Sequence, residues 1–221
     1  TTFVGHPLAN KIPLKSNKFK YRKMLKLKRK ELVIALLPGS RMGELKAHTD
    51  TLLETAQNLL EVHPDAKFLI PATNDKNVHF IKGRIRNNPT KNLKLIKGKV
   101  DEILSSSNIA IAASGTASLQ IALHKKPMII IYKGSWISYF IWKMVRLIPN
   151  VSLPNILLNE NFVPEMLQHR ATPNLLSEKA CKIINDKKYL KKIEFKFNRL
   201  HKDLKKNTSS LIFKIIKPYL K

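Results

Sequence analysis

Two short turns carry the residue types of anion-binding loops, and each lies between an apolar run and a helical pattern. They are Pro-Gly-Ser-Arg at 38–41 and Ser-Gly-Thr at 114–116. A helix N-terminus offers unpaired N–H groups and the positive end of its dipole, which suits a phosphate. Gly39 lets the backbone approach an anion closely, and Arg41 adds a planar, permanently charged group. The pair of turns predicts a site for a nucleotide diphosphate, whereas the first turn alone is also compatible with a tight turn in which Arg41 is a solvated cap residue.

The elements that must position these turns alternate along the chain between short apolar runs and longer helical patterns. Strands are predicted at 32–37, 67–71, 93–96, 108–113 and 127–132. Helices are predicted at 44–62, 77–86, 100–105 and 117–124. Such alternation is typical of βαβ units, so the predicted fold class is α/β, with a Rossmann-like parallel sheet and helices on both faces. Ligands of such sheets bind outside the carboxyl ends of the strands, where both turns fall.

The rest of the chain is organised around this predicted α/β unit. Residues 1–31 read as an entry segment with a strongly basic stretch, residues 32–172 as the nucleotide-binding domain, and residues 173–221 as C-terminal helices. Within the second range, 152–155 is predicted to be irregular and 164–168 to form a turn of helix. The C-terminal helices are expected to break near residues 186 and 207, at Asp and Asn residues that favour helix caps.

Candidate ligand contacts lie in the two turns and shortly after them. The turns contribute Gly39, Ser40, Arg41, Ser114, Gly115 and Thr116. Gln120 lies four residues after Thr116 and shares its helical face, so it is either a partner for sugar hydroxyls or an ordinary surface glutamine. Asn155, beside the apolar run 156–158, is either a donor to phosphate or sugar or an amide that satisfies buried backbone groups.

Several kinds of site are not indicated. Neither turn has the pattern of a Walker loop or a dinucleotide fingerprint, which argues against ATP and NAD. The chain has a single cysteine, Cys181, and no Asp-x-Asp pair, so we expect no cofactor and no metal. No Ser/His/Asp or Cys/His set stands out. His6, in a Gly-His-Pro sequence, reads more readily as a turn residue than as a catalyst.

The charge of the chain is strongly positive, with 41 Lys and Arg against 15 Asp and Glu and a formal net charge of +26. This excess predicts an anionic partner, namely nucleic acid, an acidic membrane surface or a phosphorylated substrate, but drift in an AT-rich coding sequence would produce it too. A nucleic-acid-binding module would interleave cations with stacking aromatics. Here the cations spread over the whole chain, so we expect no nucleic acid.

Membrane contact is predicted at a single place. No apolar run reaches the roughly 18–20 residues that a spanning helix needs, and the N-terminal residues lack the pattern of a signal peptide. The helical pattern at 135–147 is apolar and aromatic, so it is either a core helix or a helix in a membrane interface. The interfacial interpretation would use Trp136, Phe140, Lys143 and Arg146.

Taken together, the motifs resemble those of the lipid-A-disaccharide synthase family of bacterial glycosyltransferases. The matching stretches, in order, are 3–9, 35–41 with Glu44, 112–117, 127–128 with Tyr132, 151–155, 165–168 and 200–201. The resemblance implies the two-domain B-type glycosyltransferase fold, with this chain as the donor-binding C-terminal half. It also implies an inverting transfer of 2,3-diacylglucosamine from its UDP carrier to 2,3-diacylglucosamine 1-phosphate. Another UDP-sugar enzyme of the same fold, such as an epimerase, is the alternative.

The same resemblance implies roles for individual residues and partners. Arg41 and Asn155 would act in catalysis through the diphosphate and donor sugar, while Glu44 and the 114–116 turn would contact the donor. The family usually has glutamate where this chain has Gln120. The implied location is the cytoplasmic face of the inner membrane, held peripherally, with a missing N-terminal domain or a second copy as protein partner. Without that domain's general base, the chain is expected to bind donor but to turn over poorly.

Overall fold

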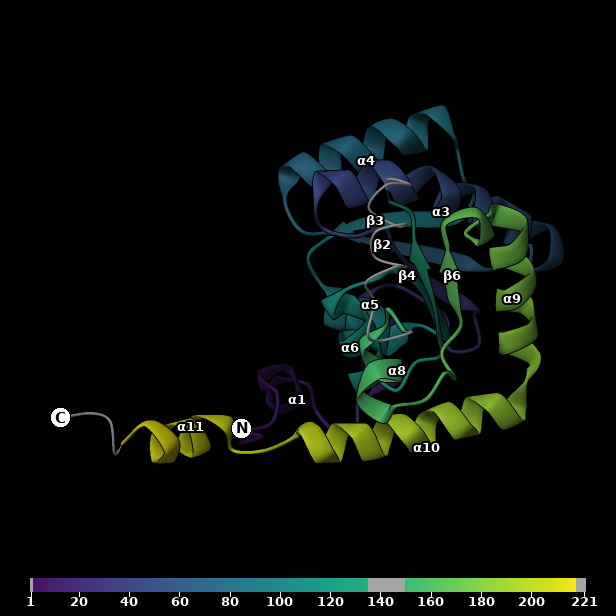
Figure 1. Ribbon diagram of the computed structural model, residues 1–221. Coiled ribbons are helices and arrows are strands. Elements are labelled where there is room, and N and C mark those ends of the chain that lie inside the picture. The colour runs from purple at the N-terminus through teal and green to yellow at the C-terminus, as the bar shows by residue number, and fades with distance from the viewer. Residues whose placement is uncertain (1, 135–149, 218–221) are drawn as a thin grey trace.

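A single parallel sheet organises the computed structural model, which describes residues 2–134 and 150–217 (Figure 1). Its strands run in the order β3-β2-β1-β4-β5-β6. They are β1 (Val33–Leu37), β2 (Lys67–Ala72), β3 (Leu93–Lys97), β4 (Ile109–Ala113), β5 (Met128–Tyr132) and β6 (Glu165–Leu167). The order reverses between β1 and β4, which pair directly from Ile34 with Ile109 to Leu37 with Ala112. Such a reversal opens a crevice at the carboxyl ends of the strands, where ligands of this fold bind.

Helices cover both faces of the sheet, as predicted (Figure 1). They are α1 (Pro7–Lys11), α2 (Lys18–Met24), α3 (Met42–Val62), α4 (Asp75–Asn87), α5 (Val100–Ser106), α6 (Thr116–Leu123), α8 (Leu153–Leu158), α9 (Pro173–Asn185), α10 (Lys187–Leu204) and α11 (Thr208–Ile216). In β1, Val33 and Ala35 pack toward α5, α6 and α10, while Ile34 and Leu36 pack toward α3, α4 and α9. The period of two along a strand thus divides the core into two apolar layers.

Local signals explain most of these elements. The helix α3 places Leu45, Leu52, Ala56 and Leu59 on one buried face at helical spacing. It ends at Val62, because the next residue, His63, precedes a proline. The predicted strands and helices between residues 32 and 132 are all present within two residues of their expected ends. The expected breaks at 186 and 207 are confirmed as well, since α9, α10 and α11 meet there.

The N-terminal segment contains two helices, α1 and α2, that the sequence analysis missed. Its backbone is tied to the end of α10 by a hydrogen bond from the His6 N–H to the Leu204 carbonyl, at 3.0 Å. Arg22, on α2, is buried and donates from Nε to the Ser106 carbonyl at 2.9 Å. Lys126 donates to the carbonyls of the two serines that flank Ser106, and burial lowers its pKa to about 7. Two of the basic side chains, Arg22 and Lys126, therefore bind carbonyl groups at the C-terminal end of α5.

Two short elements differ from the sequence prediction. Residues 153–158, expected to be irregular at their start, form α8, because Pro154 suits the first turn of a helix. Residues 165–167, expected to be helical, form the edge strand β6, which pairs in parallel with Ile130–Tyr132. An unpaired sheet edge offers these residues backbone partners that a single isolated turn of helix would lack.

The C-terminal helices take different positions. The helix α9 packs on α3, and α10 packs across α6 and α1, so these two belong to the α/β unit. The helix α11 extends beyond α1 and leaves Ile212, Phe213, Ile215 and Ile216 between 40 and 55% exposed (Figure 1). Within the described residues, no helix combines the length and apolar character needed to cross a membrane. The predicted interfacial helix with Trp136, Phe140, Lys143 and Arg146 lies outside those residues.

Candidate functional site

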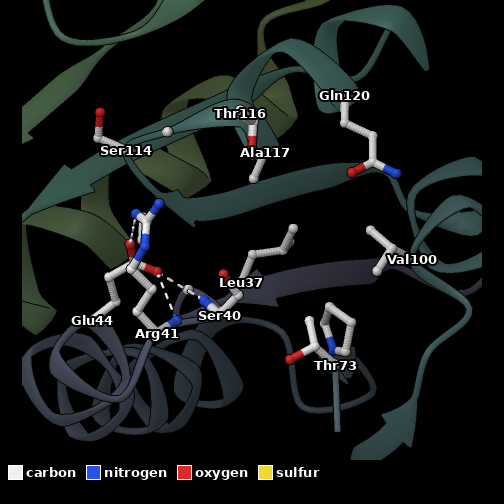
Figure 2. A pocket seen from close by; sticks show the side chains of 14 residues that line it. Leu37, Ser40, Arg41, Glu44, Thr73, Val100, Ser114, Thr116, Ala117 and Gln120 are labelled. Carbon is white, nitrogen blue, oxygen red and sulfur yellow. Dashed lines mark hydrogen bonds and ion pairs between the residues drawn. The ribbon is translucent and has the colours of Figure 1, made fainter. Parts of the chain in front are cut away.

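The loops that leave β1 and β4 face each other across one pocket at the point where the strand order reverses (Figure 2). Its cavity measures about 280 Å³. Eight of the nine predicted substrate and catalytic contacts line it, namely Gly39, Ser40, Arg41, Glu44, Ser114, Gly115, Thr116 and Gln120. The prediction that the two turns converge is confirmed, because both lie at the carboxyl ends of adjacent parallel strands.

Glu44 organises the loop after β1. Its carboxylate accepts hydrogen bonds from the N–H groups of Ser40 and Arg41, at 2.8 and 3.2 Å, and from the Arg41 guanidinium at 3.0 Å. Burial alone would raise the pKa of the Glu44 carboxyl, but these donors outweigh it, so the pKa lies below its ordinary value. Two backbone donors that the sequence had suggested for a ligand are therefore taken by the protein itself, and the loop offers the exposed Arg41 side chain.

Gly39 is required by the same arrangement. Its φ is +111°, a conformation that side chains rarely adopt, and a β-carbon there would overlap the Glu44 side chain. The anion that this glycine lets the backbone approach is thus the carboxylate of Glu44. The loop after β1 is held in one shape before any ligand arrives, which favours a preorganised site.

The loop after β4 leaves its helix N-terminus open. Gly115, with φ +144°, precedes α6, and no side chain among the described residues caps the helix. Within residues 2–134 and 150–217, no atom lies within 4 Å of the position that a β-carbon would take on Gly115. Ser114 donates through Oγ to the Val151 carbonyl at 2.9 Å, which fixes the loop from behind. The N–H groups at the start of α6 are the backbone donors that remain suited to an anion in this pocket.

Asn155 lies behind the pocket, and the structure corrects the expectation that it donates to phosphate or sugar. It is fully buried, and its amide nitrogen donates to the Val163 carbonyl at 2.9 Å and to Glu165 Oε1 at 2.8 Å. Its oxygen accepts from the N–H groups of Phe162 and Val163. All its hydrogen-bonding capacity is used, so it satisfies buried groups, as in the alternative interpretation. Glu165, which the sequence analysis did not single out, also accepts from the N–H groups of residues 151 and 152.

A Ser/His/Asp set, which did not stand out in the sequence, forms between α5 and α6. His124 Nε2 lies 3.0 Å from Asp101 Oδ1, and its Nδ1 lies 3.1 Å from Ser105 Oγ. Ser105 and His124 are buried, and neither lines the pocket. The serine hydroxyl therefore has no access to a substrate, which excludes nucleophilic catalysis by this set. The spacing of four residues between Asp101 and Ser105 on one helix was its only signal in the sequence.

His48, on α3, joins the pocket loop to the end of β5. Its Nδ1 lies 3.2 Å from the Pro38 carbonyl, which can only accept, and its Nε2 accepts from the Lys133 N–H at 3.0 Å. These partners require the neutral imidazole with its proton on Nδ1. Burial lowers the pKa of His48 and outweighs the opposing effects of Pro38 and Glu44, while the nearby Lys133 adds the smallest effect, in the same direction as burial. No pattern in the sequence had indicated a role for His48.

Acidification is expected to destabilise the protein through His48. In the unfolded chain the pKa of His48 returns to about 6.5. Below that pH the imidazole therefore takes up a proton more readily in the unfolded state than in the folded state. The free energy of unfolding should therefore fall as the pH drops below about 6.5. Urea unfolding at pH 7.5 and 5.0 checks this with His48→Gln, whose amide can replace both hydrogen bonds without titrating. We expect a smaller acid loss than in the parent, whereas the exposed His79→Gln should match the parent. Equal acid losses in both variants would contradict this role.

The chain matches known proteins along nearly its whole length. A family model described as lipid-A-disaccharide synthetase matches residues 1–216. The lipid-A-disaccharide synthase of Dechloromonas aromatica is 40% identical over 212 residues, which cover 94% of this chain and 55% of that protein. That of Methylobacillus flagellatus is 35% identical over 222 residues, covering 100% of this chain and 59% of the relative. The chain thus spans little more than half the length of these relatives.

Solved structures agree on the fold. The C-terminal domain of a group 1 glycosyl transferase from Francisella tularensis superposes with a TM-score of 0.59 at 15% identity, covering 92% of this chain and all of that one. The lipopolysaccharide glycosyltransferase WaaG gives a TM-score of 0.58 at 12% identity, with 95% of this chain and 54% of that chain covered. These likenesses identify the fold as the C-terminal half of a B-type glycosyltransferase.

Proposed function

Because the chain belongs to the lipid-A-disaccharide synthase family, we propose that its pocket binds the UDP-sugar donor in the synthesis of the lipid A disaccharide. The observation that carries this proposal is the convergence of Arg41 and the open N-terminus of α6 on one cavity. A diphosphate needs several positive or N–H groups on one side, and this arrangement offers them from two separate loops. A Staphylococcus aureus protein solved with UDP shares the fold at a TM-score of 0.55 and 13% identity, which adds plausibility but no residue assignment.

The proposed reaction is an inverting hexosyl transfer. A hydroxyl of 2,3-diacylglucosamine 1-phosphate attacks the anomeric carbon of UDP-2,3-diacylglucosamine. A new glycosidic bond forms as the bond to UDP breaks, and the electron pair leaves with the diphosphate. Arg41 and the first N–H groups of α6 would stabilise that charge, so protein groups rather than a metal would hold the leaving group. Removal of the attacking hydroxyl's proton needs a base within hydrogen-bond reach. We propose that this base belongs to the half of the relatives that this chain does not cover.

The proposed partners follow from the substrates. Both sugars carry acyl chains, so the complete enzyme would collect them at the inner membrane, where anionic lipids would attract a protein with a net charge of +26. Sedimentation with vesicles checks this, because binding should require anionic lipid and weaken with salt.

A nucleic-acid-binding module is the second candidate from another class, and it rests on the charge alone.

Titration calorimetry with UDP, UMP and uridine tests the proposed function. We expect UDP to bind at least about tenfold more tightly than UMP, because the second phosphate adds hydrogen bonds between charged groups. No binding of UDP, or equal affinity for UDP and UMP, would contradict a diphosphate site. Retention of RNA with steep salt dependence and no effect of UDP would favour the nucleic-acid candidate instead.

A further inference from the structure

The orientation of the Gln120 side chain is set from outside the pocket. Its Nε2 donates to Asp101 Oδ1 at 2.7 Å. A carboxylate can only accept, so the nitrogen of the amide must face Asp101 and its oxygen must face the other way. Figure 2 shows that oxygen turned toward the interior of the pocket, with the nitrogen directed away. Gln120 therefore presents its oxygen, a hydrogen-bond acceptor, to the pocket, because the amide cannot turn over to present its nitrogen.

Asp101 is itself held as an anion. Its Oδ1 receives a second hydrogen bond from Nε2 of the buried His124, whose other ring nitrogen pairs with the hydroxyl of Ser105. Asp101 lies in the first turn of α5, where the helix dipole favours negative charge. The hydrogen bond from His124 is the main reason why the pKa of Asp101 lies below its ordinary value. The carboxylate thus remains an obligate acceptor at neutral pH, which keeps the Gln120 amide in one orientation.

We propose that Asp101 is a positioning residue, which with His124 fixes Gln120 so that its oxygen accepts a hydrogen bond from a sugar hydroxyl of the bound nucleotide. This inference rests on the proposed function, because it takes the ligand to be a nucleoside diphosphate. A glutamate at position 120 would bring a second carboxylate against Asp101 at the distance of the present hydrogen bond. In this chain the glutamine and the aspartate therefore form a matched pair, in which the charge sits behind the pocket and the neutral acceptor inside it.

Exchanging the amide at position 120 and the carboxylate at position 101 tests whether Asp101 orients Gln120. Calorimetry compares UDP with 2′,3′-dideoxy-UDP, which lacks the ribose hydroxyls, and the ratio of their dissociation constants measures how far binding depends on those hydroxyls. For the parent we expect a ratio of about ten, the size of one good hydrogen bond. Gln120→Glu should reduce it to near one, since the new carboxylate is repelled by Asp101. Adding Asp101→Asn to that variant should restore it, because the asparagine amide can donate to the glutamate.

Two controls make the outcomes distinct. Asp75→Asn removes an exposed carboxylate that pairs with Lys97, outside the pocket lining, and should leave the ratio unchanged. If Asp101 had a merely structural role, the variants would bind both nucleotides equally more weakly, and the ratio would keep its parental value in every variant. This result would overturn the inference and leave the proposed function standing. A double variant no better than Gln120→Glu would do the same. Failure of the parent to bind either nucleotide would instead overturn the proposed function, and this inference with it.

Discussion

Arg41→Ala is expected to weaken the binding of UDP between about tenfold and a hundredfold, without measurable loss of stability. The Arg41 side chain is 85% exposed, and its ion pair with Glu44 lies at the pocket surface. A hydrogen bond to a charged group contributes about 1.5–3 kcal/mol, which corresponds to that range of affinity. Exposed ion pairs contribute little to folding, so the free energy of unfolding should change by less than about 1 kcal/mol. Calorimetric titration and urea unfolding measure the two quantities.

Arg86→Ala is the matched control for this prediction. Arg86 is an exposed arginine near the C-terminal end of α4 and does not line the pocket, yet its loss lowers the net charge by the same amount. If the general positive field attracts UDP, both substitutions will weaken binding equally. This outcome would show that Arg41 makes no specific contact with UDP. If Arg41 contacts the diphosphate, the control will bind like the parent. The two results also separate a specific contact from the effect of the net charge of +26.

Asn155→Ala is expected to lower the free energy of unfolding by about 3–5 kcal/mol, as is usual when a buried hydrogen-bond network loses its central member. The change would strip partners from the N–H groups of Phe162 and Val163, from the Val163 carbonyl and from the Glu165 carboxylate. Asn155→Asp should also destabilise strongly, because it sets a carboxylate against Glu165 at the site of the present 2.8 Å hydrogen bond. Chemical denaturation measures both variants.

Asn174→Ala provides the comparison, since that amide makes one exposed contact with Asn58 and should cost less than about 1 kcal/mol. The affinity for UDP distinguishes the two interpretations of Asn155. Because this side chain does not line the pocket, the variant should bind UDP within about threefold of the parent wherever it remains folded. A stable Asn155→Ala protein that has lost UDP binding would instead support a direct contact with the ligand.

The framework of the α/β unit could be predicted because its signals are local. Five strands are short apolar runs bounded by turn residues, and α3 repeats its buried leucines at helical spacing. Once the strands are parallel, their carboxyl ends share one edge, so the turns at 38–41 and 114–116 had to lie on the same side of the molecule. The pairing of β1 with β4 then brings them to one pocket.

The details of the site depend on contacts that no local pattern reveals. The strand β6 has only three residues and exists because the edge of β5 offers it hydrogen bonds. Asn155 and Glu165 meet across ten residues of chain, and His48 reaches Lys133 across eighty-five. Glu44 was tied to the site by resemblance alone; it takes the loop's own N–H groups from the third position of α3, as in a capping box, although position 41 lacks the Ser or Thr that usually marks one. Such roles follow from which donors and acceptors are left over after folding.

Backbone amide NMR of the chain during titration with UDP, with uridine as the reference ligand, decides whether the diphosphate binds between the two loops. We expect UDP, and not uridine, to shift the amide signals of Arg41, Gly115 and Thr116, because the diphosphate would lie between the loops that leave β1 and β4. Shifts confined to the basic N-terminal segment at 15–30, or identical shifts with both ligands, would contradict this expectation.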